Sequence, residues 1–335
     1  MKEKRWLRTA AAVLALLFLF CSVCLGEDDD FIPPSPEPPE AAGRERPTPE
    51  PTAKPDQKII DHIHFPRELP GFHFGKDSKL LEIWFPNIKD ADEAILTYDG
   101  EVCLIDCGDE RAGARGTILL RQLGITWIDT VYLSHLHHDH INGLAVTDQT
   151  AKVGEVRICF DPDTTESGLN MELTAEERGI AVRRYRSGDC FNMGEDGAVR
   201  LWFMRAEDPE LDMNNQSAMA KVEYRERSVL FTADVEKDGQ AELAGTADPA
   251  FFRCDIVKYP HHAKSAMAES FYELLGARLA IITSVQGRED YGQQYVVAKR
   301  LPAAYTSVKG KVIHLVTDGE YWLCEYVALN DEEKR

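Results

Sequence analysis

Apolar and polar positions along the chain follow two periods, and both predict regular secondary structure. Short runs rich in β-branched and aromatic residues are typical of strands, and three further stretches have the apolar spacing of helices. Because strands and helices interleave, the pattern favours an α/β domain. The predicted strands cover 81–85, 93–96, 101–105, 130–133, 155–160, 199–204, 219–224, 228–231, 255–259, 279–284 and 311–316, and the predicted helices cover 116–123, 269–275 and 295–301.

The first 26 residues have the pattern of a signal peptide. Basic residues precede an apolar run over 10–20, and small residues follow up to Gly26. The run is short for a membrane span, although residues 10–25 would serve as a membrane anchor if they were kept. Cys24 offers an alternative attachment through lipid. We therefore expect an extracellular protein or one anchored at the cell surface.

Residues 27–57 differ from the rest of the chain because they are acidic and rich in proline. Such a segment cannot bury a core, and its prolines favour an extended, disordered linker. Residues 58–335 are sufficient for one sizeable core, and we expect them to form a single catalytic domain.

The net charge bears on nucleic-acid binding, and the cysteine spacing bears on zinc binding and disulfides. The formal net charge of −19 repels polyanions at long range. Strong nucleic-acid binding would therefore need a local basic groove, and the basic run at 183–186 is more typical of a solvated strand face. The cysteines beyond the signal segment have no zinc-binding spacing, and we expect buried free thiols.

Candidate chemistry is concentrated at 135–140, where four histidines and an aspartate directly follow a predicted strand. His135 and His137 can direct their imidazoles the same way, while Asp139 and His140 can face a second cation beside the first. Two adjacent divalent cations activate a shared water and bind the oxygens of a scissile ester or phosphoester. The cluster therefore indicates a metal-dependent hydrolase rather than an accidental chelator.

Further candidate residues follow other predicted strands. Asp106, Asp234 and the pair His261 and His262 each come directly after such a strand. In layered α/β folds, strand ends of this kind bring side chains from several strands into one cleft. A carboxylate there can bridge two cations, and Asp234 is the predicted bridge.

In chain order, the motifs Leu-Ile-Asp-Cys-Gly, His-x-His-x-Asp-His, Thr-Ala-Asp and Pro-His-His resemble those of the metallo-β-lactamase-fold hydrolases over roughly Leu80 to Val327. Within that superfamily the chain looks most like the domain attached to ComEC-type DNA-uptake channel proteins and its free-standing secreted relatives. This narrower resemblance is based on Asn-Asn-Gln-Ser at 214–217, Asp-Ile-Val-Lys-Tyr-Pro-His-His at 255–262 and Val-Thr-Asp-Gly-Glu-Tyr at 316–321. It implies a four-layer αββα sandwich with metals at one edge of the two mixed sheets.

The resemblance also implies two divalent ions, with zinc expected and manganese as the alternative. His135 and His137 match the ligands of the first metal, and Asp139 and His140 match those of the second. One of His261 and His262 completes the second site, with His261 preferred, and the other donates a proton or a hydrogen bond to the substrate. Asp139, His261 and His262 are the predicted catalytic residues, and the predicted metal ligands are His135, His137, Asp139, His140, Asp234, His261 and His262.

Asp106 is expected to orient a ligating histidine rather than to bind metal. No histidine occurs between His140 and Asp234, so the third histidine that the superfamily uses for its first metal is missing. Asn214, Asn215 and Ser217 occupy that interval and are predicted to lie beside the ligands or the substrate. Amide and hydroxyl groups are weaker ligands than imidazole, which predicts a loosely held first metal.

The chain also departs from the ComEC-type pattern at positions where that branch commonly has glycine. Ala233, Ala263 and the acidic segment 90–93 stand there instead. These changes leave the predicted ligands intact. They make a positive φ angle more costly in the loops that carry those ligands.

The predicted function is a secreted or surface-anchored phosphodiesterase whose substrate is nucleic acid or a cell-wall polymer, with no protein partner inferred. A hydrolase of carbon esters, thioesters or lactams on the same fold is the first alternative. The missing histidine speaks against it, because lactamases depend on the first metal site. A non-catalytic binding protein with a degraded site is the second alternative, and the retained ligand-grade residues speak against that one.

Overall fold

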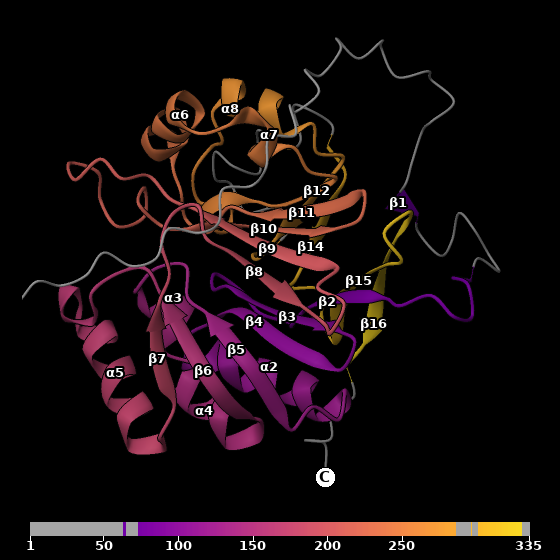
Figure 1. The fold of residues 1–335 in the computed structure, drawn as a ribbon, viewed down its shortest axis with the longest axis horizontal. Coiled ribbons are helices and arrows are strands. Elements are labelled where there is room, and N and C mark those ends of the chain that lie inside the picture. The colour runs from indigo at the N-terminus through magenta and orange to yellow at the C-terminus, as the bar shows by residue number, and fades with distance from the viewer. Residues whose placement is uncertain (1–62, 65–72, 286–295, 297–300, 330–335) are drawn as a thin grey trace, which may run out of the picture. The chain divides into compact units, whose positions relative to one another are not determined.

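The computed structural model describes residues 63–64, 73–285, 296 and 301–329, which belong to the unit Gln57–Arg335. Two mixed β-sheets of this unit lie face to face, with helices on both outer faces (Figure 1). The predicted signal segment and linker, residues 1–57, lie outside the described residues. Within the described part of the chain, no helix has the length and apolar character needed to cross a membrane.

The larger sheet has nine strands among the described residues. Its strands β2 to β4 are antiparallel, whereas β4 to β7 run parallel. From edge to edge the order is β1 (Ile63–His64), β16 (Trp322–Ala328), β15 (Lys311–Thr317), β2 (Leu81–Phe85), β3 (Glu93–Tyr98), β4 (Glu101–Cys107), β5 (Trp127–Tyr132), β6 (Lys152–Ile158) and β7 (Ala181–Arg184).

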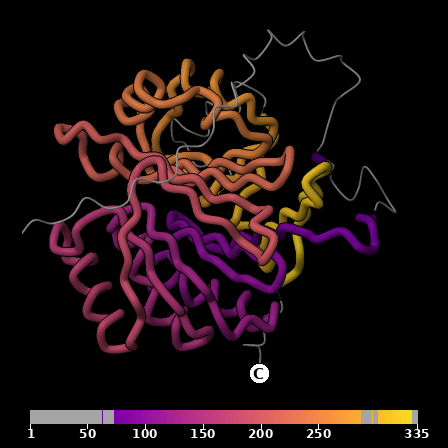
Figure 2. The backbone as a smooth tube through the Cα atoms, viewed as in Figure 1, coloured from indigo at the N-terminus to yellow at the C-terminus, as the bar shows by residue number. Residues whose placement is uncertain are grey.

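The smaller sheet has seven described strands. Strands β8 to β11 are antiparallel, and β11 to β14 are parallel. The backbone completes most of the larger sheet, builds the smaller one, and then returns to the larger sheet with its last two strands (Figure 2). The order is β14 (Ala303–Tyr305), β13 (Leu279–Ile282), β12 (Ile256–Lys258), β11 (Arg227–Phe231), β10 (Met219–Tyr224), β9 (Val199–Met204) and β8 (Cys190–Met193).

Helices cover the outer face of each sheet (Figure 1). Helices α2 (Glu110–Gln122), α4 (Leu144–Thr150) and α5 (Glu166–Arg178) pack on the larger sheet, and one apolar cluster fills that layer. Helices α6 (Lys237–Thr246), α7 (Pro249–Phe252) and α8 (Glu269–Leu275) pack on the smaller sheet over a second cluster. A third cluster, with residues from both sheets, lies between them. The predicted four-layer αββα architecture is therefore confirmed.

The predicted elements agree with the observed ones where the apolar pattern is strong. The strands β2, β9 and β10 and the helix α8 have the predicted bounds. The predicted helix 295–301 lies outside the described residues except for Val296 and Leu301. Helix α5 was not predicted, because it leaves Leu169 and Leu173 exposed and its apolar pattern marks no single face.

The basic run at 183–186 and the cysteines were also the subject of expectations from the sequence. Every residue of the edge strand β7 is exposed, and Arg183 forms an ion pair with Glu155 at 2.7 Å, as a solvated strand face would. The described cysteines are unpaired, and all are buried except Cys159 and Cys190, which are half-buried.

Candidate metal centre

The histidine cluster lies at the end of β5, where the chain leaves the larger sheet. His137 precedes the short helix α3 (His138–Ile141), whose first turn carries Asp139 and His140. The side chains of His135 and His140 are completely buried, whereas that of His138 is 69% exposed, with its Nδ1 3.9 Å from Asp139 Oδ1. The spacing therefore directs four of the five polar side chains inward.

Four of the predicted ligands form a buried group: Asp139, His140, Asp234 and His262, with one ligand atom from each lying within 4.8 Å of the others. His140 Nε2 is 3.2 Å and His262 Nε2 is 3.6 Å from Asp234 Oδ2. His262 Nε2 is also 3.4 Å from Asp139 Oδ2. Asp139 and His140 come from the larger sheet's side, and the other two residues follow β11 and β12 of the smaller sheet. The group therefore joins the two sheets at one edge.

His135 and His137 lie beside this group. His135 Nε2 is 3.0 Å from His137 Nδ1 and 4.0 Å from Asp234 Oδ2. Asp234 thus contacts histidines of both predicted metal sites. This position is suited to a bridging carboxylate.

Three ligand atoms of the group are buried without a hydrogen-bond partner among the described residues: His140 Nε2, His262 Nε2 and Asp234 Oδ1. Buried polar atoms are rarely left unsatisfied unless an ion, a ligand or water completes their environment. Imidazole nitrogens and carboxylate oxygens are ligands of divalent transition metals. The residues present therefore fit the divalent cation that the sequence predicts.

The two consecutive histidines after β12 face different environments. His261 and His262 have φ angles of 49° and 52°, and Ala263 continues the left-handed turn at 60°. This turn places His262 in the buried group, while His261 lies at its edge with Nδ1 2.6 Å from Glu236 Oε1. The sequence left open which of the two completes the second site and favoured His261, whereas the described geometry favours His262.

Three positions where the ComEC resemblance led us to expect glycine have a left-handed backbone in this chain. Ala233 has a φ of 46°, Ala263 of 60° and Asp90 of 55°. A side chain in this region costs about 1–2 kcal/mol per residue. The surrounding contacts hold these loops in the conformation that delivers Asp234 and His262.

Asp106 lies behind the ligands, as expected for an orienting carboxylate. Its Oδ2 is 2.8 Å from His140 Nδ1, and its two oxygens accept hydrogen bonds from the N–H and the hydroxyl of Ser134. Burial raises the pKa of Asp106, although the neighbouring His140 opposes the rise. Because Asp106 contacts His140 Nδ1, it leaves Nε2 of that ring directed at Asp234.

We expect Asp106→Asn to lower the affinity for the second cation about 10- to 100-fold, as the loss of partners that orient a ligand typically does. The asparagine keeps the size of the side chain, but its amide can no longer accept with both oxygens. Metal titration by calorimetry measures the effect. An unchanged affinity would contradict the orienting role.

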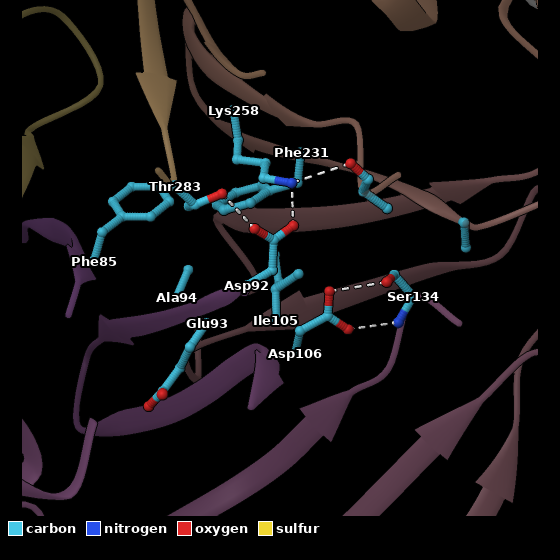
Figure 3. A pocket seen from close by; sticks show the side chains of 12 residues that line it. Phe85, Asp92, Glu93, Ala94, Ile105, Asp106, Ser134, Phe231, Lys258 and Thr283 are labelled. Atoms are coloured by element: carbon cyan, nitrogen blue, oxygen red, sulfur yellow. Dashed lines mark hydrogen bonds and ion pairs between the residues drawn. The ribbon is translucent and has the colours of Figure 1, made fainter. Parts of the chain in front are cut away.

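A second buried carboxylate was missed in the sequence. Asp92 lies just before β3, and its Oδ1 is 3.0 Å from His262 Nδ1 and accepts a 2.7 Å hydrogen bond from Thr283. Lys258, at the end of β12, forms a buried ion pair with Asp92 (Figure 3). The Lys258 ammonium also donates to Ala233 O at 3.0 Å and lies 3.9 Å from Asp234 Oδ1. Asp92 therefore orients His262 much as Asp106 orients His140.

These carboxylates change the charge that the central histidines carry. Burial opposes protonation of His262, but Asp234 and Asp92 raise its pKa to about 10. Burial acts the same way on His140, and Asp234 and Asp106 raise its pKa. His135 differs, because burial and the neighbouring His140 hold its pKa well below the ordinary value. In the metal-free protein, the neighbouring carboxylates thus favour the protonated forms of His140 and His262.

The segment with Asn214, Asn215 and Ser217 lies against the centre as predicted, but its side chains differ in their contacts. Asn215 Oδ1 accepts from Gly239 N at 2.8 Å, which attaches the segment to α6. Ser217 Oγ accepts from the N–H of Asp234 at 3.2 Å. Asn214 lies beside His137, and its Oδ1 is buried.

A model of the family described as the metallo-beta-lactamase superfamily matches residues 94–253. The match includes the histidine cluster, Asp106 and Asp234, and ends before His261 and His262. A ribonuclease Z of Methanococcus aeolicus is 42% identical over 50 residues, which make up 15% of this chain and 15% of that protein. The chain therefore matches only a small part of that relative's length.

Two solved structures illustrate the structural comparison. The metallo-beta-lactamase fold protein YhfI of Bacillus subtilis is 13% identical, with a TM-score of 0.46, over 67% of this chain and 95% of that one. MEM-A1, a subclass B3 metallo-beta-lactamase from a soil metagenome library, is 13% identical, with a TM-score of 0.39, over 54% of this chain and 76% of that one.

Proposed function

Because the chain has the metallo-β-lactamase fold and a domain of that superfamily of hydrolases, we propose that it is a phosphodiesterase that uses two divalent cations. The observation that carries the proposal is the buried group of Asp139, His140, Asp234 and His262 with its unpartnered ligand atoms. His135 and His137 would hold the other cation. Divalent cations bound there lower the pKa of a water molecule and offset negative charge on a phosphoryl group.

Other residues around the centre would receive the substrate anion and protonate the leaving oxygen. A cavity of about 440 Å³ opens beside it and is lined in part by Glu236, Lys237, Lys264 and Ser265. Lys264 Nζ is 3.7 Å from Asp139 Oδ2, so its charge lies where a substrate anion would enter. His261 contacts Glu236 through Nδ1 and has Nε2 3.7 Å from Asp234 Oδ2, and we propose that it donates a proton or a hydrogen bond to the substrate.

The proposed substrate class rests on the pair of cations, on the partial similarity to a ribonuclease Z and on the net charge of the chain. A phosphodiester fits two cations that bind adjacent oxygens, and the partial similarity to a ribonuclease Z is consistent with that class. The net charge of −19 disfavours long polyanions unless a local cationic region receives them. A nucleic acid and a phosphorylated cell-wall polymer are therefore the two candidate substrates.

The proposed setting is outside the cell, with the protein secreted or anchored at the surface. It rests on the signal-like pattern of residues 1–26 and the proline-rich spacer that follows. A lipid on Cys24 would give the same location.

Purified protein loaded with manganese or zinc should hydrolyse bis-p-nitrophenyl phosphate. We expect a chelator to abolish the activity and added metal to restore it, because the proposed reaction needs both cations. Release of p-nitrophenol measures the rate, and nitrocefin provides the matched test of lactam hydrolysis. Metal-loaded protein that cleaves nitrocefin but no phosphodiester would contradict the proposal, as would purified protein that binds no metal.

A further inference from the structure

The turn at 214–217 stands in the interval where the superfamily's third histidine is missing. The N–H and the hydroxyl of Ser217 donate to the Asn214 carbonyl at 3.0 and 2.7 Å. The same hydroxyl accepts from the N–H of Asp234, and the N–H of Ala218 donates to Ser134 O at 2.9 Å. Hydrogen bonds therefore fix the turn both to Asp234 and to the segment that carries His135.

The three side chains of the turn that the sequence placed beside the site, Asn214, Asn215 and Ser217, are not equally free to bind a cation. Asn215 donates to Asp212 at 3.1 Å and accepts from Gly239, so both ends of its amide are used. The Ser217 hydroxyl is also used in both directions. Asn214 Oδ1 is the exception, because it is buried without a hydrogen-bond partner among the described residues. Of the three, only Asn214 presents an unpartnered oxygen.

The turn also places Asn214 near the residues predicted to bind the first cation. Asn214 belongs to the same turn as Ser217, which accepts from the N–H of Asp234, and this turn is joined through Ala218 N to the carbonyl of Ser134, the residue before His135. His137 lies 3.0 Å from His135, and His135 lies 4.0 Å from Asp234. Two imidazoles, the carboxylate of Asp234 and the turn that carries the buried Asn214 Oδ1 are thus neighbours, and Asp234 alone among them also belongs to the group with Asp139, His140 and His262.

We propose that Asn214 Oδ1 is the ligand that replaces the missing histidine, so that His135, His137, Asn214 and Asp234 hold the first divalent cation. The inference rests on the proposed two-metal function and specifies the first of its two sites. With Asp234 shared, each cation then has two imidazole nitrogens and two oxygen ligands from the protein. The two sites are accordingly more alike in donor chemistry than in a centre with three histidines on one side.

The exchange of imidazole for an amide oxygen also changes the preferred metal. Carbonyl and carboxylate oxygens suit Mn²⁺, whereas imidazole favours Zn²⁺ and softer ions. The first site should therefore accept manganese more readily than a site with three histidines. This preference depends on one side chain, so it can be reversed by substitution.

The test is manganese binding to the full-length protein and to Asn214→Ala, measured by elemental analysis and by electron paramagnetic resonance. We expect two ions in the wild type and one in the variant, with the affinity for the weaker ion reduced by at least about 10-fold, the smallest effect typical of losing a partner of a ligand. The coupled signal of two neighbouring ions should become that of an isolated ion. Asn192→Ala, which removes an exposed asparagine on β8, is the matched control and should keep both ions.

Two replacements separate a ligand from a structural side chain. Asn214→Asp keeps an oxygen donor and should retain two ions, and Asn214→His should retain two ions while shifting the preference toward zinc. If Asn214→Ala binds both ions with unchanged affinity, or loses both, the assignment fails. Loss of the first ion in Asn214→Asp as well would indicate a structural role and would also overturn it. A wild-type protein that binds fewer than two ions would contradict the proposed function itself.

Discussion

Asp234→Asn is expected to remove both cations and to lower phosphodiester hydrolysis by more than about 100-fold, because changes one step further from a metal already cost up to that factor. The Asp234 side chain is 2% exposed, and its Oδ2 lies 3.2, 3.6 and 4.0 Å from His140, His262 and His135. It is therefore the contact that both predicted sites share. An asparagine keeps the shape but supplies one weak oxygen donor in place of a charged, bidentate group.

The measurement combines elemental analysis of the purified variant with the rate of bis-p-nitrophenyl phosphate hydrolysis. Asp77→Asn, which changes an exposed aspartate before β2, is the control and should behave like the wild type. The stability of Asp234→Asn should no longer respond to added metal, because ions that bind only the folded state raise its stability. A variant that keeps two ions and half of the activity would show that Asp234 is not the bridge.

Lys258→Met is expected to lower the free energy of unfolding by about 3–5 kcal/mol, the usual cost of removing one partner of a buried ion pair. Lys258 is 2% exposed, and the variant would remove the ammonium group that pairs with the Asp92 carboxylate and donates to the Ala233 carbonyl, which leaves His262 as the cationic neighbour of Asp92. The pair also connects the end of β12 to the residue before β3, so its loss weakens the junction of the two sheets. Urea denaturation of the metal-free protein measures the effect.

A double substitution distinguishes a charge effect from a packing effect. Lys258→Met combined with Asp92→Asn removes both charges, so we expect it to recover part of the stability that Lys258→Met alone loses. Asp92→Asn alone should also weaken metal binding, because Asp92 contacts His262 Nδ1 at 3.0 Å. If the losses of the two single variants simply add in the double variant, the two residues do not interact energetically.

The parts of the site that follow strand ends could be predicted from the sequence. The ends of parallel strands lie at one edge of a sheet, so the apolar runs before Asp106, His135 and Asp234 already indicated where these side chains meet. Asp92 gave no such signal, because it precedes its strand and lies in a segment without apolar periodicity. Its contact with Lys258 depends on how two sheets pack, which no local pattern describes.

The choice between His261 and His262 depends on backbone conformation rather than on spacing. Three consecutive residues adopt positive φ angles there, and none of them is glycine. Alanine and histidine give no indication of a left-handed turn in a sequence. The same applies to Asn214, Asn215 and Ser217, which form a plausible polar set until their hydrogen bonds show that only one has a free oxygen.

The last two strands, β15 and β16, are synthesised after all of the proposed metal ligands. A nascent chain that has emerged as far as His262 contains every proposed ligand, yet β2 still lacks β15, its neighbour in the larger sheet. Strand β15 reaches β2 only after more than forty further residues, and its pairing encloses the apolar layer between the sheets. A cation offered to the growing chain would meet scattered histidines rather than a preformed site. A chain that stops before Lys311 should therefore bind metal weakly, although it contains every proposed ligand.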